Sequence, residues 1–340
     1  MNKPRISIII LTRSSERLPK IFEALERQSG APAFEVIVID SRSRDGSWKF
    51  LLRFARSFPL AFARGQDDKA KMKNGNQSPK TENSCLVRIR SYCIKPCQFG
   101  HGRTRNLAVR KCKGEIVVFL TDDAMPKDTN WLARLTAPLS DRNMAAVFGR
   151  QIPYKESSIS ERFSYLMAYP DCDRIIKKDD IQRFSAGHLL YSNVNGAIKK
   201  ELLLRFPFDE KVVMSEDHWW AKDILGAGYK ICYLRGAAVY HSHNYSLSQL
   251  FCRNFTSGYS LRGFGGLGLA ESIKQGTSYI KKEISYLGYL RSLSILNILG
   301  IFVYEGVRVT GFLLGKKGGL LPAGIRRKLM VAVAGFRIEE

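Results

Sequence analysis

Acidic side chains are scarce in this sequence. Its 340 residues include 31 Asp and Glu against 54 Lys and Arg, which gives a formal net charge of +23. A protein this basic is expected to meet polyanions: nucleic acid, phosphorylated small molecules or an anionic membrane. Residues 121–270 hold 16 of the carboxylates against 19 basic residues, a local net charge of only +3. We therefore look for a site that needs carboxylates in this middle part of the chain.

Paired cysteine motifs are missing. None of the seven cysteines forms a C-x-x-C pair, which argues against a zinc ribbon or a thioredoxin-like redox site. We expect reduced thiols in a reducing compartment. The N-terminal stretch MNKPRISIIILTR has a short apolar core and no small-residue cleavage site, so it predicts a buried strand rather than a secretory signal.

Long hydrophobic runs are missing as well. Residues 292–304 form an uncharged stretch of 13 residues between Arg291 and Glu305. A helix that spans a bilayer needs about 20 residues, so this stretch is too short. Its basic flanks and tyrosines fit a segment that lies on an anionic membrane surface. A buried helix of a second domain is equally compatible with the pattern.

The apolar content is sufficient for a sizeable core. Hydrophobic residues make up 45% of the chain and aromatic residues 11%, which excludes global disorder. Apolar strands are predicted at 5–12 and 34–41, each followed by an amphipathic helix, at 14–28 and 45–58. Ser14 or Ser15 is the expected cap of the first helix. This alternation predicts an α/β fold with a mostly parallel sheet flanked by helices.

The pattern continues to about residue 246 and then changes. Further elements are predicted as strands at 85–90, 115–124 and 145–151, helices at 102–113, 128–139 and 215–228, a strand or turn and then a helix within 184–206, and two short strands within 229–246. Residues 65–84 are polar and predict a flexible surface insertion. We expect one domain at 1–246 and a helical, basic, membrane-associating C-terminal region at 247–340.

Two pairs of carboxylates stand out. Asp122 and Asp123 end a hydrophobic strand, where their burial is costly unless a cation is near. A divalent ion held by one or two carboxylates and substrate phosphates meets that need, and a polar turn that caps the next helix is the alternative. Glu216 and Asp217 open a helix, either as partners of its dipole or with a general base among them.

Two further motifs carry groups that bind metals or phosphates. His241 and His243 lie two residues apart, so both face the same side of an extended segment, and histidine is a common metal ligand. The segment HGRTRN places Arg103 and Arg105 beside glycines that allow a close approach of the backbone. Each of these motifs is weak when it is taken alone.

Taken in order, these features resemble the family 2 glycosyltransferases, which have the nucleotide-sugar-binding GT-A fold. The resemblance covers roughly residues 5–245 and is strongest to bacterial rhamnosyltransferase-like members. It is carried by FGHGRTRNLAVRKCKGEIVVFLTDDAMPKDTNWLARL and by SNVNGAIKKELLLRFPFDEKVVMSEDHWWAKDILGAGYKI. The motif Gln-x-x-Arg-Trp, which is associated with processive polysaccharide synthases, is not visible, so a single transfer per encounter is expected.

The resemblance also implies roles for individual residues. Binding of the donor nucleotide is implied for Thr12, Arg13, Asp40, Arg105, Asn106 and Asp122. Asp217 matches the catalytic base, with Glu216 as its neighbour. Asp123 matches a ligand of a divalent cation, Mg²⁺ or Mn²⁺, and His243 or His241 would complete that metal site.

The activity implied is inverting, metal-dependent transfer of one sugar, rhamnose among the candidates, from a nucleotide-sugar donor to a glycan or lipid-linked acceptor. The expected location is cytoplasmic, peripheral on the inner face of the cell membrane. Another donor, such as a UDP-hexose or GDP-mannose, is an open alternative. A nucleic-acid-binding protein is the alternative from another class, but the basic residues form no aromatic-interleaved patch, so no nucleic acid is expected. A transferase-like scaffold without activity is a third alternative, and the retained acidic pairs argue against it.

Overall fold

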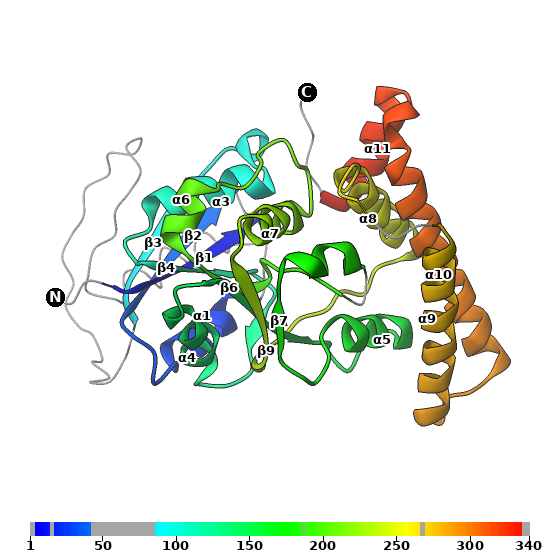
Figure 1. Cartoon of the computed structure of the whole chain (residues 1–340), viewed down its shortest axis with the longest axis horizontal. Coiled ribbons are helices and arrows are strands. Elements are labelled where there is room, and N and C mark those ends of the chain that lie inside the picture. The colour runs from blue at the N-terminus through cyan, green and yellow to red at the C-terminus, as the bar shows by residue number, and fades with distance from the viewer. Residues whose placement is uncertain (1–3, 14–16, 42–85, 186–187, 266–268, 335–340) are drawn as a thin grey trace.

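A central sheet with helices on both faces forms most of the molecule (Figure 1). The computed structural model describes residues 4–13, 17–41, 86–185, 188–265 and 269–334. The strands are β1 (Ile6–Thr12), β2 (Phe34–Asp40), β3 (Leu86–Cys93), β4 (Ile116–Leu120), β5 (Met125–Pro126), β6 (Met144–Ile152), β7 (Arg174–Ile176), β8 (Asn195–Lys199) and β9 (Lys230–Tyr240). The helices are α1 (Leu18–Glu26), α3 (His101–Lys111), α4 (Trp131–Thr136), α5 (Ile159–Ala168), α6 (Lys200–Arg205), α7 (Glu216–Gly226), α8 (Leu247–Ser260), α9 (Leu269–Tyr289), α10 (Ile295–Lys316) and α11 (Ala323–Ala334).

The sheet is mostly parallel, as predicted. Its order in the described part of the chain is β3-β2-β1-β4-β8-β6-β9-β5, with β7 paired to β9. Strands β1, β2, β3, β4, β6 and β9 run in one direction. Strand β8 runs antiparallel between β4 and β6, and the short β5 and β7 run antiparallel to β9. The parallel strands therefore end at one edge, where open α/β sheets place their ligands.

The alternation of side chains along the strands divides the core into two layers. On one face Ile9, Ile37 and Ile39 pack with residues of α3, α6 and α7. On the other face Ile8 and Val36 pack with residues of α1 and α4. Both faces are apolar because helices cover both, which explains the near-continuous apolar strands of the sequence.

One local expectation is corrected by the structure, and others fall outside the described residues. Helix α1 begins at Leu18 with Arg17 at its N-cap position, and the predicted caps Ser14 and Ser15 lie outside the described residues. Residues 229–246 contain one long strand, β9, whose pairing with β6 shifts register between Gly149 and Gln151. A bulge, not a chain break, therefore interrupts this strand. The predicted helix at 45–58 and the insertion at 65–84 lie outside the described residues.

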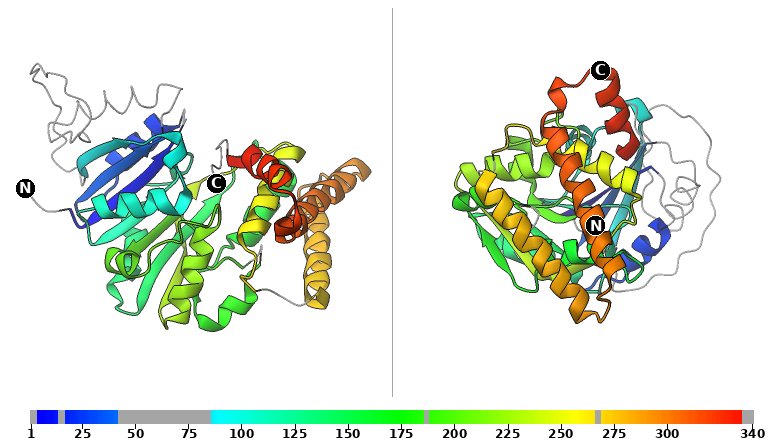
Figure 2. Two further views of the ribbon diagram at one scale, coloured as in Figure 1. Left: turned by 90° about the horizontal axis from the view of Figure 1, so that it is seen from above. Right: turned by 90° about the vertical axis from the view of Figure 1, so that its right-hand side faces the viewer.

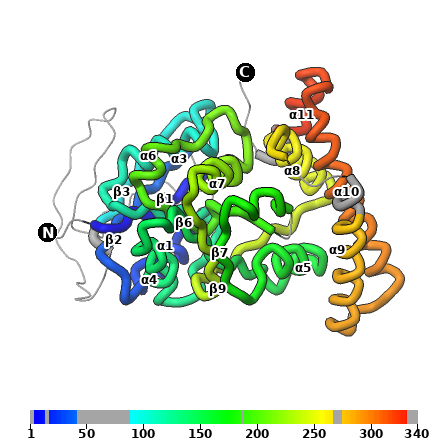
Figure 3. The backbone as a smooth tube through the Cα atoms, in the orientation of Figure 1, coloured from blue at the N-terminus to red at the C-terminus, as the bar shows by residue number. Residues whose placement is uncertain are grey.

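The C-terminal helices lie together at one end of the molecule (Figure 2). The chain leaves β9, forms α8 against the sheet domain and continues into α9, α10 and α11 (Figure 3). The stretch expected to be short, 292–304, extends through Glu305 and Arg308 into a helix of 22 residues. In the described chain this one helix is long and apolar enough to cross a membrane, by length and composition alone.

Candidate active site

The carboxyl edge of the sheet gathers the predicted nucleotide-binding residues. Thr12 ends β1 directly beside Asp40, which ends the neighbouring strand β2, and both are buried. Strand β4 pairs with β1 on its other side, and Asp122 and Asp123 follow it. Three adjacent parallel strands thus deliver their polar ends to one place, because parallel strands in register end together.

Asp123 meets the two predicted histidines. Its carboxylate oxygens lie 3.4 Å from His241 Nε2 and 3.7 Å from His243 Nδ1. One ligand atom from each of the three residues falls within 4.8 Å of the others. A carboxylate and two imidazoles form a donor set that suits a divalent transition metal such as Mn²⁺, since Mg²⁺ prefers oxygen ligands.

A second layer of contacts orients His241. Gln151 Nε2 donates to the Tyr169 hydroxyl at 2.6 Å and to Ser192 Oγ at 3.1 Å. Its Oε1 therefore faces His241 Nδ1, 2.8 Å away, and accepts the proton of that nitrogen. In a neutral ring Nε2 then presents its lone pair toward Asp123, which is how metal-binding histidines are commonly held. The residues present therefore fit a divalent cation.

The pKa values of the cluster follow from burial and neighbouring charge. Burial alone would raise the pKa of Asp123, but His241 and His243 more than offset it, so its pKa lies below the usual range. Burial and then the charge of Asp123 raise the pKa of Asp122 to about 7. Burial, His241 and Arg253 lower the pKa of His243 to about 3. At neutral pH Asp123 is therefore ionised beside a neutral His243, the forms in which both groups bind metals.

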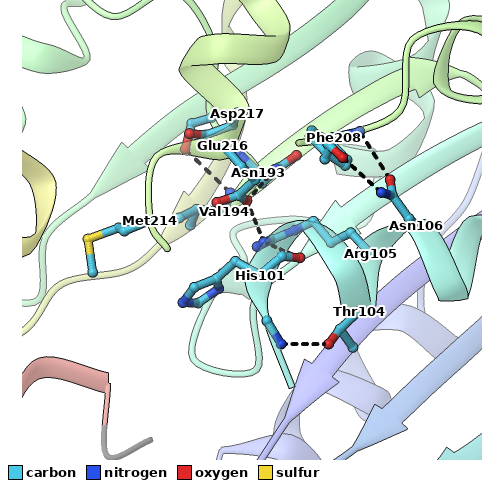
Figure 4. A network of polar contacts seen from close by, with 12 residues as sticks. His101, Thr104, Arg105, Asn106, Asn193, Val194, Phe208, Met214, Glu216 and Asp217 are labelled. Atoms are coloured by element: carbon cyan, nitrogen blue, oxygen red, sulfur yellow. Dashed lines mark hydrogen bonds and ion pairs between the residues drawn. The ribbon is translucent and has the colours of Figure 1, made fainter. Parts of the chain in front are cut away.

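Glu216 and Asp217 begin α7, and Glu216 pairs with a buried arginine (Figure 4). Arg105 Nη1 donates to Glu216 Oε1 at 2.5 Å, and Asn193 Nδ2 donates to the same oxygen at 3.1 Å. Burial would raise the pKa of Glu216, but Arg105 and His101 more than offset it and lower the pKa. Glu216 is thus ionised inside the protein, where its pair with Arg105 holds the start of α7.

Asp217 is half-buried, and its side chain is held by two backbone amides. Asn193 N–H donates to Oδ2 at 3.1 Å and His218 N–H donates to Oδ1 at 2.9 Å. Ser215, which precedes the helix, has a left-handed φ of 65°, uncommon for a residue with a side chain. A fixed orientation with part of the carboxylate open to the surroundings is what a general base requires.

The segment 192–194 connects the two acidic clusters. Thr121 N–H, one residue before Asp122, donates to the Val194 carbonyl at 3.1 Å. The neighbouring Asn193 N–H contacts Asp217, and Ser192 Oγ contacts Gln151. The same short segment therefore contacts Asp217, the residue that precedes Asp122, and the glutamine that orients His241.

Arg105 and Asn106 are engaged with the protein itself. Asn106 Nδ2 donates to the Phe208 carbonyl, and Asn106 Oδ1 accepts from Phe208 N–H. A Cβ on Gly102 would lie 2.8 Å from the Asp209 carbonyl oxygen, so this glycine admits a protein segment. The predicted contact of Arg105 and Asn106 with the nucleotide stays a prediction. In this structure Arg105 binds Glu216 at the start of α7, and Asn106 binds the chain at Phe208. Arg103 is exposed.

A cavity of about 620 Å³ opens beside the metal cluster. Asp123 and His243 line it, together with Arg17, Tyr154 and Tyr245. The Arg17 guanidinium lies 4.3 Å from the centre of the Tyr154 ring and donates to the Asp123 carbonyl at 3.5 Å. The cavity thus offers a cation and aromatic faces next to the candidate metal ligands.

Sequence reasoning missed several residues that the structure brings to this site. Gln151 is a polar residue near the end of the buried strand β6, a local signal that the sequence does show. Glu161 accepts from His243 N–H at 3.4 Å, and this contact joins residues far apart in the sequence. Arg253 of α8 faces Tyr245, Tyr165, Glu161 and Asp123; burial alone would lower its pKa, and these groups raise it instead.

Helix α8 contacts both halves of the site. It begins directly after the segment 241–246 that carries the two histidines. At its other end Ser260 Oγ accepts from Met214 N–H at 3.2 Å, and the Ser260 carbonyl accepts from Trp219 Nε1 at 2.9 Å. Leu261 and Phe264 join the core of the sheet domain. The start of the C-terminal region therefore packs as part of that domain.

Comparison with known proteins identifies the family. The model of glycosyl transferase family 2 matches residues 88–212. The O-antigen chain rhamnosyltransferase RfbN of Salmonella typhimurium is 30% identical over 293 residues, which covers 83% of this chain and 81% of the relative. The O-antigen chain rhamnosyltransferase WbaN of Salmonella anatum is 30% identical over 297 residues, 84% and 81% of the two chains. The chain belongs to glycosyltransferase family 2.

Solved structures confirm the fold. S. aureus TarS 1–349 in complex with UDP aligns with a TM-score of 0.50 and 14% identity, over 97% of this chain and 87% of TarS. The mannosyltransferase PcManGT from Pyrobaculum calidifontis aligns with a TM-score of 0.52 and 18% identity, over 98% and 85%. The predicted family and GT-A fold are thus confirmed, and this family 2 member is a glycosyltransferase. The family match ends before Glu216, so the site assignments stay predictions.

Proposed function

We propose that this family 2 glycosyltransferase is an inverting, metal-dependent enzyme that moves one sugar from a nucleoside-diphosphate sugar to a hydroxyl of a glycan or lipid-linked acceptor. Two curated relatives are named O-antigen chain rhamnosyltransferases, so rhamnose is the proposed sugar and bacterial surface polysaccharide the proposed product. The proposed location is cytoplasmic, peripheral on the inner face of the cell membrane. PcManGT was solved with GDP-Man and Mn²⁺, which supports a nucleotide donor and a divalent cation.

One observation carries this proposal: the segment 192–194 joins Asp217 to the cluster of Asp123, His241 and His243. Inverting transfer needs a base on the acceptor side and a neutralised leaving group on the donor side of one anomeric carbon. Asp217 supplies the first and the metal cluster supplies the second. Hydrogen bonds to Asn193 and Thr121 keep the two in fixed relation.

The chain's own residues then have distinct tasks. Asp217 accepts the proton of the acceptor hydroxyl as its oxygen forms the new glycosidic bond. The bond between the anomeric carbon and the diphosphate breaks on the opposite side, and its electron pair leaves with the nucleoside diphosphate. This single displacement inverts the anomeric carbon and needs no protein nucleophile. Glu216, through its pair with Arg105, holds the helix that carries the base.

The donor side has binding groups and positive charge. Thr12, Asp40 and Asp122, at the ends of adjacent strands, are the proposed nucleoside contacts, with Arg13 beside them. Asp123, His241 and His243 would hold the cation, which when bound offsets the charge that develops on the departing diphosphate. Arg17 and Arg253 bring further positive charge next to this cluster.

The test is Asp217→Asn, assayed for sugar transfer and, by calorimetry, for donor binding. Transfer should fall on the order of 10³-fold, because a general base contributes about 10²–10⁴-fold, while donor affinity stays unchanged. Asp223→Asn, on an exposed turn of the same helix, is the matched control and should keep full activity.

The calorimetry compares dTDP-rhamnose, UDP-glucose and GDP-mannose with Mn²⁺ or with a chelator, so it also identifies the donor. Near-normal turnover of Asp217→Asn would show that Asp217 is not the catalytic base. Equal donor affinity with Mn²⁺ and with chelator would show that donor binding does not depend on a metal ion.

A further inference from the structure

Helix α10 presents its apolar side chains to the outside. The exposed ones recur every three or four residues, so they form one stripe. This stripe, called here the outer face of α10, consists of Ile295, Leu296, Leu299, Phe302, Val303, Val309, Leu313 and Leu314. Ile295 and Leu296 are 78% and 80% exposed. A helix of a soluble protein normally turns such a stripe toward the core.

The opposite face of α10 is turned inward and carries one buried isoleucine beside its charged and small residues. Glu305 is buried and accepts hydrogen bonds from Arg308, with Arg308 Nε at 2.7 Å. Gly311 and Gly315 pack directly on α8: a Cβ on Gly315 would lie 2.1 Å from the Phe255 carbonyl oxygen. These contacts fix the rotation of α10, so the apolar stripe cannot turn inward without breaking them.

The surroundings of this stripe carry charge of one sign. Among the described side chains of residues 274–330, both acidic ones, Glu283 and Glu305, are buried. The exposed charged side chains there are all cationic: Lys274, Lys281, Lys282, Arg291, Lys316, Lys317, Arg327 and Lys328. A second copy docking through this face would bring like charges together, whereas an anionic surface would attract all of them.

We propose that the outer face of α10 lies in the boundary between headgroups and acyl chains of an anionic membrane, with the flanking basic side chains on lipid phosphates. An apolar stripe bordered by Lys and Arg is the arrangement expected of an interfacial helix. A spanning orientation fits less well, because the buried Glu305–Arg308 pair and the packing on α8 tie one side of α10 to the protein.

Helix α10 also contacts Glu161, which binds the backbone of the candidate metal ligand His243. Tyr304 of α10 donates to Glu161 Oε2 at 2.8 Å, and Glu161 Oε1 accepts from His243 N–H. The membrane-bound helix would therefore hold the site at a fixed position above the lipid surface. This consequence rests on the proposed function, in which the acceptor is lipid-linked.

The test uses flotation of the full chain with vesicles of equimolar phosphatidylglycerol and phosphatidylcholine, and with phosphatidylcholine alone. Wild type should float with the anionic vesicles and much less with the neutral ones. Leu299→Asp/Phe302→Asp should weaken the partition at least about tenfold, because it removes apolar area and adds like charge to the lipid. Leu204→Asp, at an exposed leucine of α6, is the matched control and should bind as wild type.

A second variant keeps the test valid if the first one fails to fold. Lys316→Gln/Lys317→Gln leaves the stripe intact and should weaken binding to anionic vesicles by roughly fivefold per lysine. High salt should remove this difference, because it screens the lysine contribution to wild-type binding. Circular dichroism and calorimetric donor binding on each variant show whether the fold and the nucleotide site are intact. These readouts separate failure of the membrane proposal from failure of the transferase proposal.

Three results would overturn the membrane proposal. One is unchanged flotation of both variants. Another is a wild-type dimer in light scattering that Leu299→Asp/Phe302→Asp converts to a monomer, since the stripe would then be a protein interface. The third is resistance of the bound chain to extraction with alkaline carbonate, which indicates a spanning helix.

Discussion

The sheet domain and helix α10 expose different kinds of surface. In the sheet domain, apolar strands fill two core layers, and the carboxylates of the candidate site lie at one edge of the sheet. In the C-terminal region, the Glu305–Arg308 pair is inside and the apolar stripe of α10 is outside. The first arrangement is that of a protein in water, and the second is that of a helix with an apolar neighbour. The exposed side chains of each region therefore indicate which surroundings that region faces.

The largest stability effect is expected where a buried ion pair is broken in the sheet domain. Glu216→Ala leaves Arg105, whose side chain is 8% exposed, without its carboxylate partner. The free energy of unfolding should fall by about 3–5 kcal/mol in urea denaturation followed by tryptophan fluorescence. Glu305→Ala in α10 is the comparison and should cost less, because Arg308 is 20% exposed and can reach water. A larger loss for Glu305→Ala would reverse this ranking of the two regions.

A smaller effect is expected where α10 packs on α8. In Gly315→Ala the new Cβ meets the Phe255 carbonyl oxygen at 2.1 Å, so the helices must separate, at a cost of about 1–3 kcal/mol. Gly306→Ala on the same helix meets no atom within 4 Å and should stabilise the chain by about 0.5–1 kcal/mol. Calorimetric melting and hydrogen exchange of α10 measure both. If the two variants melt alike, the close contact between α8 and α10 is absent in solution.

The smallest effect concerns the buried acid of α9. Burial raises the pKa of Glu283 to about 7, and its neighbour Glu305 adds to the rise. A raised folded-state pKa means that the stabilising effect of the proton is present below the unfolded-state value, about 4.5, and is lost as pH rises through 7.

Glu283→Gln should therefore gain stability over wild type between pH 5 and 8, by about 1 kcal/mol after allowance for screening. Lys281→Gln, exposed on the same helix, is the control and should show no such trend. A difference between Glu283→Gln and wild type that stays constant across this pH range would show that the carboxyl is solvated.

The sequence contained the main outline of this molecule because its strongest signals are local. Asp40, Asp122 and Asp123 end apolar strands, and parallel strands end together, so their meeting at one edge follows from the fold class. Glu216 and Asp217 also carry a local signal, because they are carboxylates at the start of a helix.

What the sequence did not disclose depends on contacts across the chain. Arg105 looks like a phosphate ligand in its own segment, but its partner Glu216 is 111 residues away. Gln151 and Glu161 support the histidines through packing that no short motif records. The length of α10 was underestimated because Glu305 and Arg308 resemble the ends of an apolar run, although they pair within one helix turn.

Helix α8 begins beside the histidines and ends on the helix that carries Asp217, and its 14 residues span about 21 Å. It therefore sets the distance between the histidine segment and the start of α7, which carry the proposed metal ligands and the proposed base. If the C-terminal helices were exchanged for those of a relative, this distance would be kept only when α8 stayed with the catalytic domain. The natural junction for building chimeras thus falls after Phe264, not at the end of the sheet.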